Sequence, residues 1–323
     1  MTILVTGAAG FIGYHAALAL LKRGETVVGV DCLTDYYDVA LKHARLEQLE
    51  RHAGFRFERL DLADHDAVRA LFLQVRPERV LHLAAQAGVR YSLQAPFAYT
   101  HANITGHLSV LEAVRALEGH VQHLVYASSS SVYGEREASQ TGFKETDAVD
   151  APVSLYAATK RADELISASY AHLYDLPLTG LRFFTVYGPW GRPDMAYFSF
   201  AEKLIAGETL PLFNEGRNTR DFTFIGDMIP PLLTVLDDAP GPRNAVFNIG
   251  GSAPVTTLDL VAALETHLGV TGKTELLPPQ PGDVTHTCAD TTALERAYGP
   301  APHTPLKDGV GAFAAWFKTW KAR

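Results

Sequence analysis

The chain has 323 residues, long for one small domain, and 47% of them are hydrophobic, enough to bury a large core. The formal net charge of −8, without any basic block, argues against a general nucleic-acid binder. No apolar run reaches the ~18 residues of a membrane span, and two cysteines, Cys32 and Cys288, are too few for a disulfide framework, so we expect a cytoplasmic protein.

Strand-like and helix-like stretches alternate through the first half of the chain. The strand patterns occupy residues 2–6, 26–30, 55–60, 79–83, 122–127 and 178–184. The helical patterns between them occupy residues 11–21, 39–51, 63–74, 96–117 and 155–174. This alternation predicts an α/β fold with a doubly wound parallel Rossmann sheet and helices on both faces. Ligands of such sheets bind at the carboxyl ends of the strands.

The pattern changes after residue 184, where glycine and proline become frequent and the elements become shorter. Helices are predicted at residues 198–206, 227–238, 257–268 and 307–321, with a turn at 214–218. We therefore expect a nucleotide-binding domain at residues 1–184 and a smaller α/β substrate lobe formed mainly by residues 185–323. Some segments of the second half are expected to return to the first domain.

A glycine-rich turn joins the first strand to the first helix. Gly7, Gly10 and Gly13 follow the spacing G-x-x-G-x-x-G. Glycines permit a tight turn and the close approach of a pyrophosphate, and the N-terminus of the helix favours its negative charge. The same string can also be a turn without a ligand, but here the strand, the helix and a following acid are all present.

Acidic residues end the next two strands. Asp31 ends the second strand, where a carboxylate can accept hydrogen bonds from ribose hydroxyls and would repel a 2′-phosphate. This favours NAD over NADP. Asp61 and Leu62 end the third strand and could contact the adenine edge. The alternative, that Asp61 caps the helix that starts at Ala63, is equally compatible with the sequence.

A tyrosine and a lysine lie four residues apart in the predicted helix 155–174. On a helix this spacing places Tyr156 and Lys160 on one face. A free tyrosine titrates near ~10 and is a poor base at neutral pH, but an ammonium one turn away stabilises a phenolate. Such a pair can take a proton from a substrate hydroxyl. Ser129, within the serine run that ends the fifth strand, can bind the same substrate oxygen, although four serines can also be turn residues.

Eight motifs carry a resemblance to a known family over nearly the whole chain. In order they are TGAAGFIG, HLAAQAGVRYS, YASSSSVYG, SLYAATK, LRFFTVYGPWGRPDM, RDFTFIGDM, FNIG and QPGDV. The sequence resembles the extended short-chain dehydrogenase/reductase superfamily and, within it, is most similar to the UDP-glucuronate 4-epimerases. The first two motifs are common to the superfamily, whereas YASSSSVYG, SLYAATK and RFFTVYGPWGRPDM together are much narrower.

The resemblance implies a tightly bound NAD and a set of site residues. The implied cofactor-binding residues are Gly7, Gly10, Phe11, Ile12, Gly13, Asp31, Asp61, Leu62, Ala84, Ala85, Gln86, Tyr156 and Lys160. The implied catalytic residues are Tyr156 as the base, Lys160 and Ser129. The implied substrate-binding residues are Ser129, Ser130, Ser131, Tyr156, Thr185, Arg192, Phe213, Arg220 and Asp283. No metal site is implied.

The activity that the resemblance implies is 4-epimerisation of UDP-glucuronate to UDP-galacturonate through a transient 4-keto intermediate. That intermediate is a β-keto acid and is prone to lose CO₂, so the enzyme must hold its carboxylate. Arg192 is the candidate, because a guanidinium can bond a carboxylate bidentately. The alternative is that Arg192 pairs with Asp194. Thr185 lies where UDP-galactose 4-epimerases typically have asparagine, which argues against a neutral hexose.

Three other activities remain open at this stage. A UDP-glucuronate decarboxylase or a 4-epimerase of a neutral UDP-hexose would share the fold, NAD, Tyr156 and Lys160. A non-catalytic NAD-binding protein would share the fold and NAD but would turn over no UDP-sugar. The long helices 96–117 and 155–174 correspond to helices that pair in dimeric relatives. A homodimer is therefore expected, with Leu108, Leu111 and Val114 partly at its interface. No nucleic-acid or membrane partner is expected.

Overall fold

The structure, a computed structural model, describes residues 1–136, 142–240, 243–279 and 284–322. Its central sheet has seven parallel strands, ordered β10-β6-β5-β4-β1-β2-β3. The strands are β1 (Thr2–Thr6), β2 (Thr26–Asp31), β3 (Phe55–Arg59), β4 (Arg79–His82), β5 (His123–Ser129), β6 (Pro177–Phe183) and β10 (Arg243–Ile249). The predicted doubly wound parallel sheet is confirmed. The strand order reverses between β1 and β4, and this is where such sheets open a ligand crevice.

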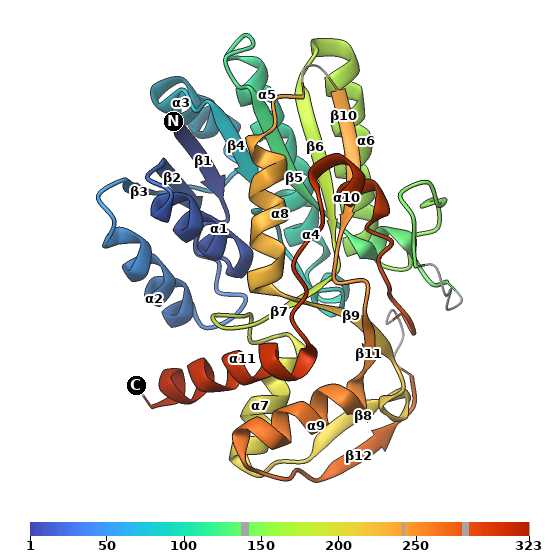
Figure 1. Ribbon diagram of the computed structural model, residues 1–323. Coiled ribbons are helices and arrows are strands. Elements are labelled where there is room, and N and C mark those ends of the chain that lie inside the picture. Colours follow the sequence, from blue (N-terminus) through green and yellow to red (C-terminus); the bar gives the residue numbers. More distant parts are fainter. Residues whose placement is uncertain (137–141, 241–242, 280–283, 323) are drawn as a thin grey trace.

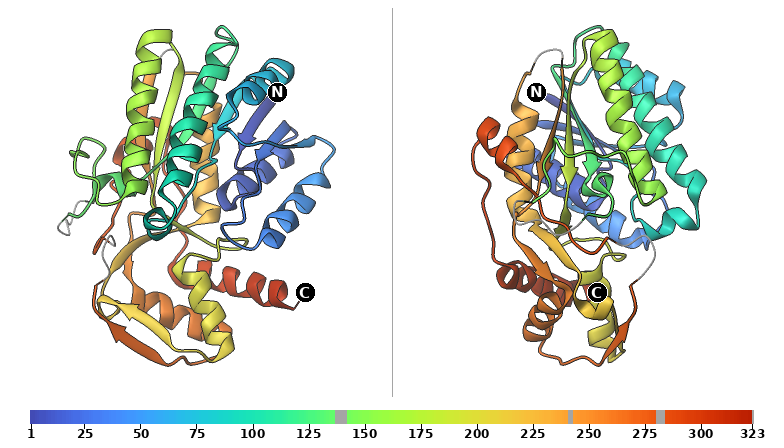
Figure 2. Two further views of the ribbon diagram at one scale, coloured as in Figure 1. Left: turned by 180° about the vertical axis from the view of Figure 1, so that it is seen from behind. Right: turned by 90° about the vertical axis from the view of Figure 1, so that its right-hand side faces the viewer.

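Helices cover both faces of the sheet, because its side chains alternate between two hydrophobic cores. Ile3 and Val5 of β1 belong to one core, and Leu4 between them belongs to the other. The first core is covered by α1 (Phe11–Lys22), α2 (Val39–Glu50), α8 (Ile225–Asp237) and α10 (Thr292–Tyr298). The second is covered by α3 (His65–Val75), α5 (Gly106–Arg115) and α6 (Leu155–Tyr174), and Figure 2 shows α5 and α6 side by side on the outside.

The region predicted as one regular helix over residues 96–117 is interrupted by a π-helical turn. It consists of α4 (Pro96–Tyr99), the π-helix η2 (Thr100–Thr105) and α5. A short 3₁₀-helix, η1 (Arg90–Leu93), precedes it. The prediction of a uniform helix was therefore wrong in this detail. π-Helical turns are rare and often occur at functional sites, and this one carries the buried side chain of Asn103.

The expected dimer residues of α5 do not all face outward. Leu108 is 38% exposed, but Leu111 and Val114 are 0% and 2% exposed and belong to the core between α5 and the sheet. The expectation that Leu111 and Val114 contribute to an interface is thus wrong, because the chain itself already buries them. Helix α6 exposes three large hydrophobic side chains, Leu165, Leu173 and Tyr174.

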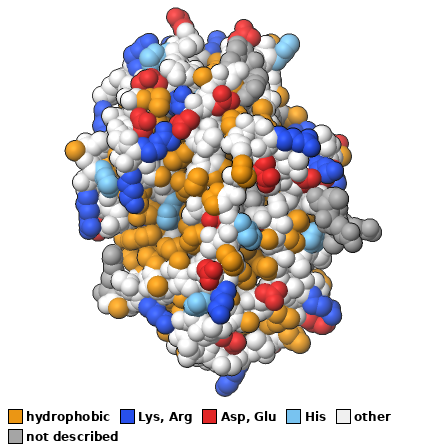
Figure 3. Space-filling view, viewed as in Figure 1, with side chains coloured by type: hydrophobic (Ala, Val, Ile, Leu, Met, Phe, Trp, Pro, Cys, Tyr) orange, Lys and Arg blue, Asp and Glu red, His pale blue; other side chains and the backbone are white. Residues whose placement is uncertain are grey.

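The smaller part of the molecule lies below the sheet in Figure 1 and has a core of its own, in which the aromatic rings of Tyr187, Phe198 and Phe313 take part. Its strands are β7 (Thr185–Tyr187), β8 (Leu210–Phe213), β9 (Thr219–Phe224), β11 (Pro254–Thr256) and β12 (Thr274–Leu277), paired as β11-β9-β7 and β12-β8. Its helices are α7 (Ala196–Ala206), α9 (Thr257–Leu268) and α11 (Leu306–Lys321), and the 3₁₀ turn η4 (Asn214–Gly216) follows β8. Another 3₁₀ turn, η3 (Ser130–Tyr133), follows β5 of the central sheet. In Figure 3 a band of hydrophobic side chains marks the level where the two parts meet.

The second half of the chain contributes to both parts. Strand β10 extends the large sheet beside β6, and α8 and α10 pack on its face, whereas α7, α9 and α11 belong to the smaller part. The chain therefore crosses between the parts more than once, and a cavity between them is lined from many segments. Among the helices of the described residues, none combines the length and the apolar character needed to cross a bilayer.

Candidate active site

One cavity of about 790 Å³ opens at the carboxyl ends of the strands and extends to the smaller part. The predicted residues that line it are Gly7, Gly10, Phe11, Ile12, Gly13, Asp31, Asp61, Leu62, Ala84, Ala85, Gln86, Ser129, Ser130, Ser131, Tyr156, Lys160, Thr185, Arg192, Phe213 and Arg220. Asp283 lies outside the described residues. The volume is in the upper part of the ~300–1,000 Å³ typical of ligand pockets, so the cavity has room for a large ligand.

The glycine-rich turn is built so that backbone alone forms its floor. Gly7 has a φ of +71°, and its N–H donates to the carbonyl of Val30 at 2.7 Å. A Cβ on Gly13 would lie 2.0 Å from the carbonyl oxygen of Gly7, so only glycine allows α1 to approach the turn this closely. No side chain caps α1, and its first turn has no acidic residue. The positive end of the helix is therefore available to an anion in the cavity.

Two aspartates lie at the side of the cavity expected to hold a nucleoside. The carboxylate of Asp31 accepts hydrogen bonds from the backbone N–H groups of Ala9, at 3.2 Å, and Leu33, at 2.8 Å, which fixes it at the end of β2. Asp61 accepts a hydrogen bond from the N–H of Ala63 at 3.0 Å, but the alternative that it caps a helix starting at Ala63 is wrong. Helix α3 itself begins later, at His65, with Asp64 as its N-cap.

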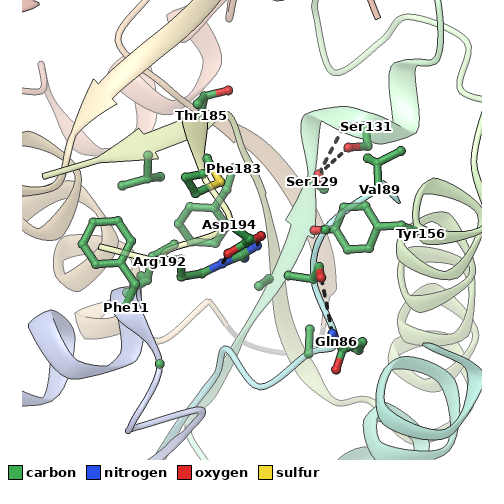
Figure 4. A pocket seen from close by; sticks show the side chains of 18 of the residues that line it. Phe11, Gln86, Val89, Ser129, Ser131, Tyr156, Phe183, Thr185, Arg192 and Asp194 are labelled. Carbon is green, nitrogen blue, oxygen red and sulfur yellow. Dashed lines mark hydrogen bonds and ion pairs between the residues drawn. The ribbon is translucent and has the colours of Figure 1, made fainter. Parts of the chain in front are cut away.

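The predicted catalytic pair, Tyr156 and Lys160, lies in the first two turns of α6. The Oγ of Ser154 accepts the N–H of Ala157 at 3.1 Å and caps the helix, which places Tyr156 and Lys160 one turn apart. In Figure 4 the ring of Tyr156 projects into the cavity with its hydroxyl toward the centre. The Nζ of Lys160 is almost completely buried and donates to the carbonyl of Ala127 at 3.0 Å and to Asp163 at 3.1 Å. This fixed ammonium can stabilise negative charge on the tyrosine oxygen.

The serine run divides into one structural residue and a group that faces the cavity. The hydroxyl of Ser128 donates to the buried carboxylate of Glu164 at 2.6 Å, so its proton is used in a hydrogen bond within the protein. Ser129 ends β5, and its hydroxyl lies 3.1 Å from that of Ser131, as Figure 4 shows beside Tyr156. Ser129 also accepts the N–H of Ser131 at 3.2 Å and caps the turn. Turn chemistry and a substrate-binding role are therefore both compatible with this geometry.

Asn103, which sequence reasoning missed, connects two segments that line the cavity. Its amide exchanges hydrogen bonds with the backbone of Gln86, at 2.8 and 3.1 Å, and donates to the hydroxyl of Thr159 at 2.9 Å. Thr159 in turn donates to the carbonyl of Tyr156 at 2.8 Å. The π-helical turn thus ties the loop after β4 to the N-terminal part of α6, which carries Tyr156. An asparagine inside a helical pattern gave no signal beyond its low helix propensity.

Arg192 faces Tyr156 across the cavity, and it has a partner. Its guanidinium binds Asp194 bidentately (Figure 4), with Nε–Oδ1 and Nη2–Oδ2 distances of 3.0 and 2.5 Å. The hydroxyl of Tyr36 donates to the same carboxylate at 3.1 Å. Burial raises the pKa of Asp194, but the charge of Arg192 outweighs it and holds that pKa below its usual range. The pairing is the alternative that the sequence left open, and Tyr36 was not predicted.

The smaller part supplies an aromatic ring and two cations, and a third cation, Arg90 of η1, comes from the larger part. Phe213 ends β8, and the guanidinium of Arg90 lies 5.3 Å from the centre of its ring. Arg220, on β9, donates to the carbonyls of Thr219, at 3.0 Å, and Val284, at 2.6 Å. Lys203 of α7 also lines the cavity. Such cations suit a diphosphate. Arg90 and Lys203 were not predicted, because single basic residues in a loop or on a helix surface carry no pattern.

Comparisons with known proteins agree with this arrangement. Residues 3–250 match the NAD dependent epimerase/dehydratase family. The chain is 45% identical to UDP-glucuronate 4-epimerase 4 of Arabidopsis thaliana, over 99% of this chain and 76% of that protein. It is 34% identical to the UDP-glucuronic acid 4-epimerase of Bacillus cereus, solved with UDP-glucuronic acid and NAD, with a TM-score of 0.92 over 99% of this chain and all of that one. A UDP-glucose 4-epimerase from Thermotoga maritima, solved with UDP-glucose, is 30% identical, with a TM-score of 0.89 over the same shares.

Proposed function

The chain belongs to the NAD dependent epimerase/dehydratase family, and from this we propose that it is an NAD-dependent enzyme that interconverts UDP-glucuronate and UDP-galacturonate. The observation that carries the proposal is that Tyr156, Lys160 and Ser129 line the same cavity as the glycine-rich turn. A proton acceptor and a dinucleotide site therefore share one space. The relatives named as UDP-glucuronate 4-epimerases support this choice of substrate.

The residues at the sheet end of the cavity fit NAD. The turn at Gly7 and Gly13 leaves backbone as its floor, where a Cβ on Gly13 would collide with it, and the N-terminus of α1 is uncapped by any side chain. These features suit a pyrophosphate, and Asp31 at the end of β2 suits the ribose hydroxyls of NAD. Lys160 has three N–H donors, and within the described residues Ala127 and Asp163 accept two of them, so the third can bind a ligand in the cavity.

Bound NAD would accept a hydride from C4 of the sugar and return it to the other face. The chain's own task is to move one proton. Tyr156 takes the proton of the 4-hydroxyl and later gives it back, Lys160 stabilises the phenolate, and Ser129 binds the same sugar oxygen. Arg192 is proposed to hold the sugar carboxylate and restrain loss of CO₂, with Ser130, Ser131 and Thr185 adding hydrogen bonds; all four residues line the cavity. Phe213, Arg220 and Asp283 are proposed to hold the uridine diphosphate.

A 4-epimerase of a neutral UDP-hexose is the second candidate, and one observation favours it. Arg192 is already bound bidentately by Asp194, so in this arrangement its charge is balanced without a substrate carboxylate. The structure of a UDP-glucose 4-epimerase also aligns with nearly the whole chain. The higher identity to a protein named UDP-glucuronate 4-epimerase is the reason to rank the uronate first.

Product analysis tests the proposed function directly. Purified chain incubated with UDP-glucuronate and NAD⁺ should yield UDP-galacturonate without CO₂, as resolved by NMR. Formation of a UDP-pentose would identify a decarboxylase instead. If UDP-glucuronate does not react but UDP-glucose is epimerised, the second candidate is correct. Binding of NAD without turnover of any UDP-sugar would leave the non-catalytic alternative.

Replacing Arg192 tests how the carboxylate is held. We expect Arg192→Ala to raise the KM for UDP-glucuronate by roughly 10-fold or more, since a charged hydrogen bond contributes ~1.5–3 kcal/mol. The fraction of decarboxylated product should rise, because the carboxylate is less restrained. Arg192→Lys keeps the positive charge but loses the bidentate guanidinium, so its KM and its fraction of decarboxylated product should lie between those of the native chain and Arg192→Ala. The control is Arg217→Ala, an exposed arginine of the same part of the chain, paired with Glu215. An unchanged product ratio in Arg192→Ala would remove the proposed role.

We further propose that the enzyme is a cytoplasmic homodimer. The outward surfaces of α5 and α6 expose Leu108, Leu165, Leu173 and Tyr174, which would be covered by pairing with the same helices of a second copy. Cys32 and Cys288 are both free thiols, which fits a reducing compartment. Sedimentation of the purified chain measures the assembly state, and a monomer at micromolar concentration would argue against the dimer.

A further inference from the structure

A buried carboxyl group lies directly behind the catalytic pair. Asp163 is three residues after Lys160 on α6 and therefore lies on the same side of the helix. It is 1% exposed, and its Oδ2 accepts a hydrogen bond from the Nζ of Lys160 at 3.1 Å. Its other oxygen, Oδ1, is buried without a hydrogen-bond partner among the described residues. Burying a carboxylate with only one oxygen hydrogen-bonded destabilises the fold. The presence of this group beside Lys160 therefore needs an explanation.

The histidines packed against this pair are neutral and cannot balance its charge. His82 of β4 lies 2.7 Å from the hydroxyl of Thr6, and His107 of α5 lies 2.8 Å from the hydroxyl of Ser167. Their rings stack on each other with centroids 5.2 Å apart. Burial lowers the pKa of His82 to about 3 and that of His107 well below its usual value, and the charge of Lys160 acts in the same direction.

The remaining ionisable neighbours keep a constant charge. Glu164, the next residue on α6, binds the guanidinium of Arg182 through both oxygens, at 2.8 and 2.9 Å, and also Arg161 at 2.9 Å. Burial raises the pKa of Glu164, but Arg182 outweighs it and lowers the value overall. On β5, burial raises the pKa of Tyr126 above its usual value, so this residue stays neutral.

Asp163 differs from these neighbours. Burial raises its pKa to about 6, against the attraction of Lys160. Its charge therefore changes in mildly acidic solution, whereas the charges of His82, His107, Glu164 and Tyr126 do not.

We propose that Asp163 is a positioning residue that holds the Lys160 ammonium against the carbonyl of Ala127 and offsets its charge, and so sets the pH at which Tyr156 becomes a base. The inference rests on the proposed roles of Tyr156 and Lys160. With Asp163 ionised, the field of the ammonium at the tyrosine oxygen is partly cancelled, and the phenolate is less stabilised. Without that anion, the same ammonium acts on Tyr156 in full.

Asp163→Asn separates the charge from the hydrogen bond. The amide has nearly the same shape and keeps an oxygen that accepts from Lys160, but it carries no charge. The measurement is the pH titration of phenolate absorbance in the NAD-bound chain, taken as the difference between the chain and its Tyr156→Phe variant, with and without Asp163→Asn. We expect the midpoint for Tyr156 to move to lower pH by about one unit. The acid limb of kcat/KM for UDP-glucuronate should move in the same direction.

Two further variants sharpen the test. Asp163→Ala removes both the charge and the acceptor, so it should shift the midpoint as well and should also lower kcat, because Lys160 loses a partner. It provides the same charge change if the asparagine variant does not fold. Asp175→Asn is the matched control on α6, at the exposed C-cap where the backbone is left-handed and asparagine is well tolerated, and it should shift nothing.

An unshifted midpoint in folded Asp163→Asn overturns the inference, as does an equal shift in Asp175→Asn. The phenolate titration needs no substrate, so it is independent of the substrate assignment. A shifted midpoint in a chain that turns over no UDP-sugar would support the role of Asp163 and overturn the proposed function. Turnover of UDP-glucuronate with an unshifted midpoint would do the reverse.

Discussion

Tyr156→Phe is expected to lower kcat for UDP-glucuronate by roughly 10²–10⁴-fold, the usual contribution of a positioned acid–base group. The change removes one hydroxyl and leaves the ring, which projects into the cavity from the first turn of α6. Neither the glycine-rich turn nor Asp31 contacts that hydroxyl in any hydrogen bond of the described residues, so NAD should still bind. Steady-state kinetics measure the first effect, and calorimetric titration of NAD measures the second.

Tyr174→Phe is the matched control for this change. Tyr174 is the last residue of the same helix, is 39% exposed, and packs against the guanidinium of Arg115. It should leave kcat within about twofold of the native value, as surface changes usually have small effects. If Tyr156→Phe kept kcat within a few-fold of native, another group would have to be the base, and the proposed mechanism would fail.

Gly13→Ala is expected mainly to weaken NAD binding, whereas Tyr156→Phe is expected mainly to lower kcat. A Cβ at this position would lie 2.0 Å from the carbonyl oxygen of Gly7 and 2.7 Å from its carbon. Both neighbours are backbone atoms, so the turn and α1 must move apart. Overpacking of this kind costs about 1–3 kcal/mol, which corresponds to roughly 5–150-fold in NAD affinity if the cost falls on the binding-competent turn. Calorimetry with NAD and urea unfolding with and without NAD measure it.

Gly311→Ala provides the control for adding a methyl group to a helical glycine. Its Cβ would meet the ring of His267 at 2.9 Å, and a side chain can move where the backbone of the Gly7 turn cannot. Helix propensity favours the alanine by up to ~1 kcal/mol. NAD affinity should be unchanged. Native NAD affinity in Gly13→Ala would mean that the turn does not form the pyrophosphate site.

Much of the fold was predictable because its signals are local. Apolar runs such as residues 2–6 and 26–30 alternate with helical patterns, and the prediction of a doubly wound parallel sheet was correct. Helix α6 was predicted with its observed bounds because Ser154 supplies an N-cap before a long periodic stretch. The five strands of the smaller part were not predicted. They have three to six residues each, too few for the alternation of strand residues to stand out.

The candidate site likewise contains residues that local spacing predicts and contacts that only the folded structure shows. Spacing on one helix places Tyr156 and Lys160 together, and spacing within one turn places Gly7 and Gly13 together, so both pairs could be found from the order of residues. Whether Arg192 is free or paired with Asp194 depended on side-chain geometry and on Tyr36, a residue 156 positions before Arg192 in the numbering. The sequence left those alternatives open.

The contacts that complete the catalytic turn join segments that are remote along the chain. Asn103 reaches Thr159 only because the π-helical turn and α6 pack together, and Lys160 reaches the carbonyl of Ala127 only because α6 lies against the end of β5. The burial of Asp163 likewise depends on α5 and β5 packing against α6. Periodicity and spacing encode what a segment does with its near neighbours. Burial, and with it the energy of each charge, is set by every segment that packs around it, so it was known only once the chain was folded.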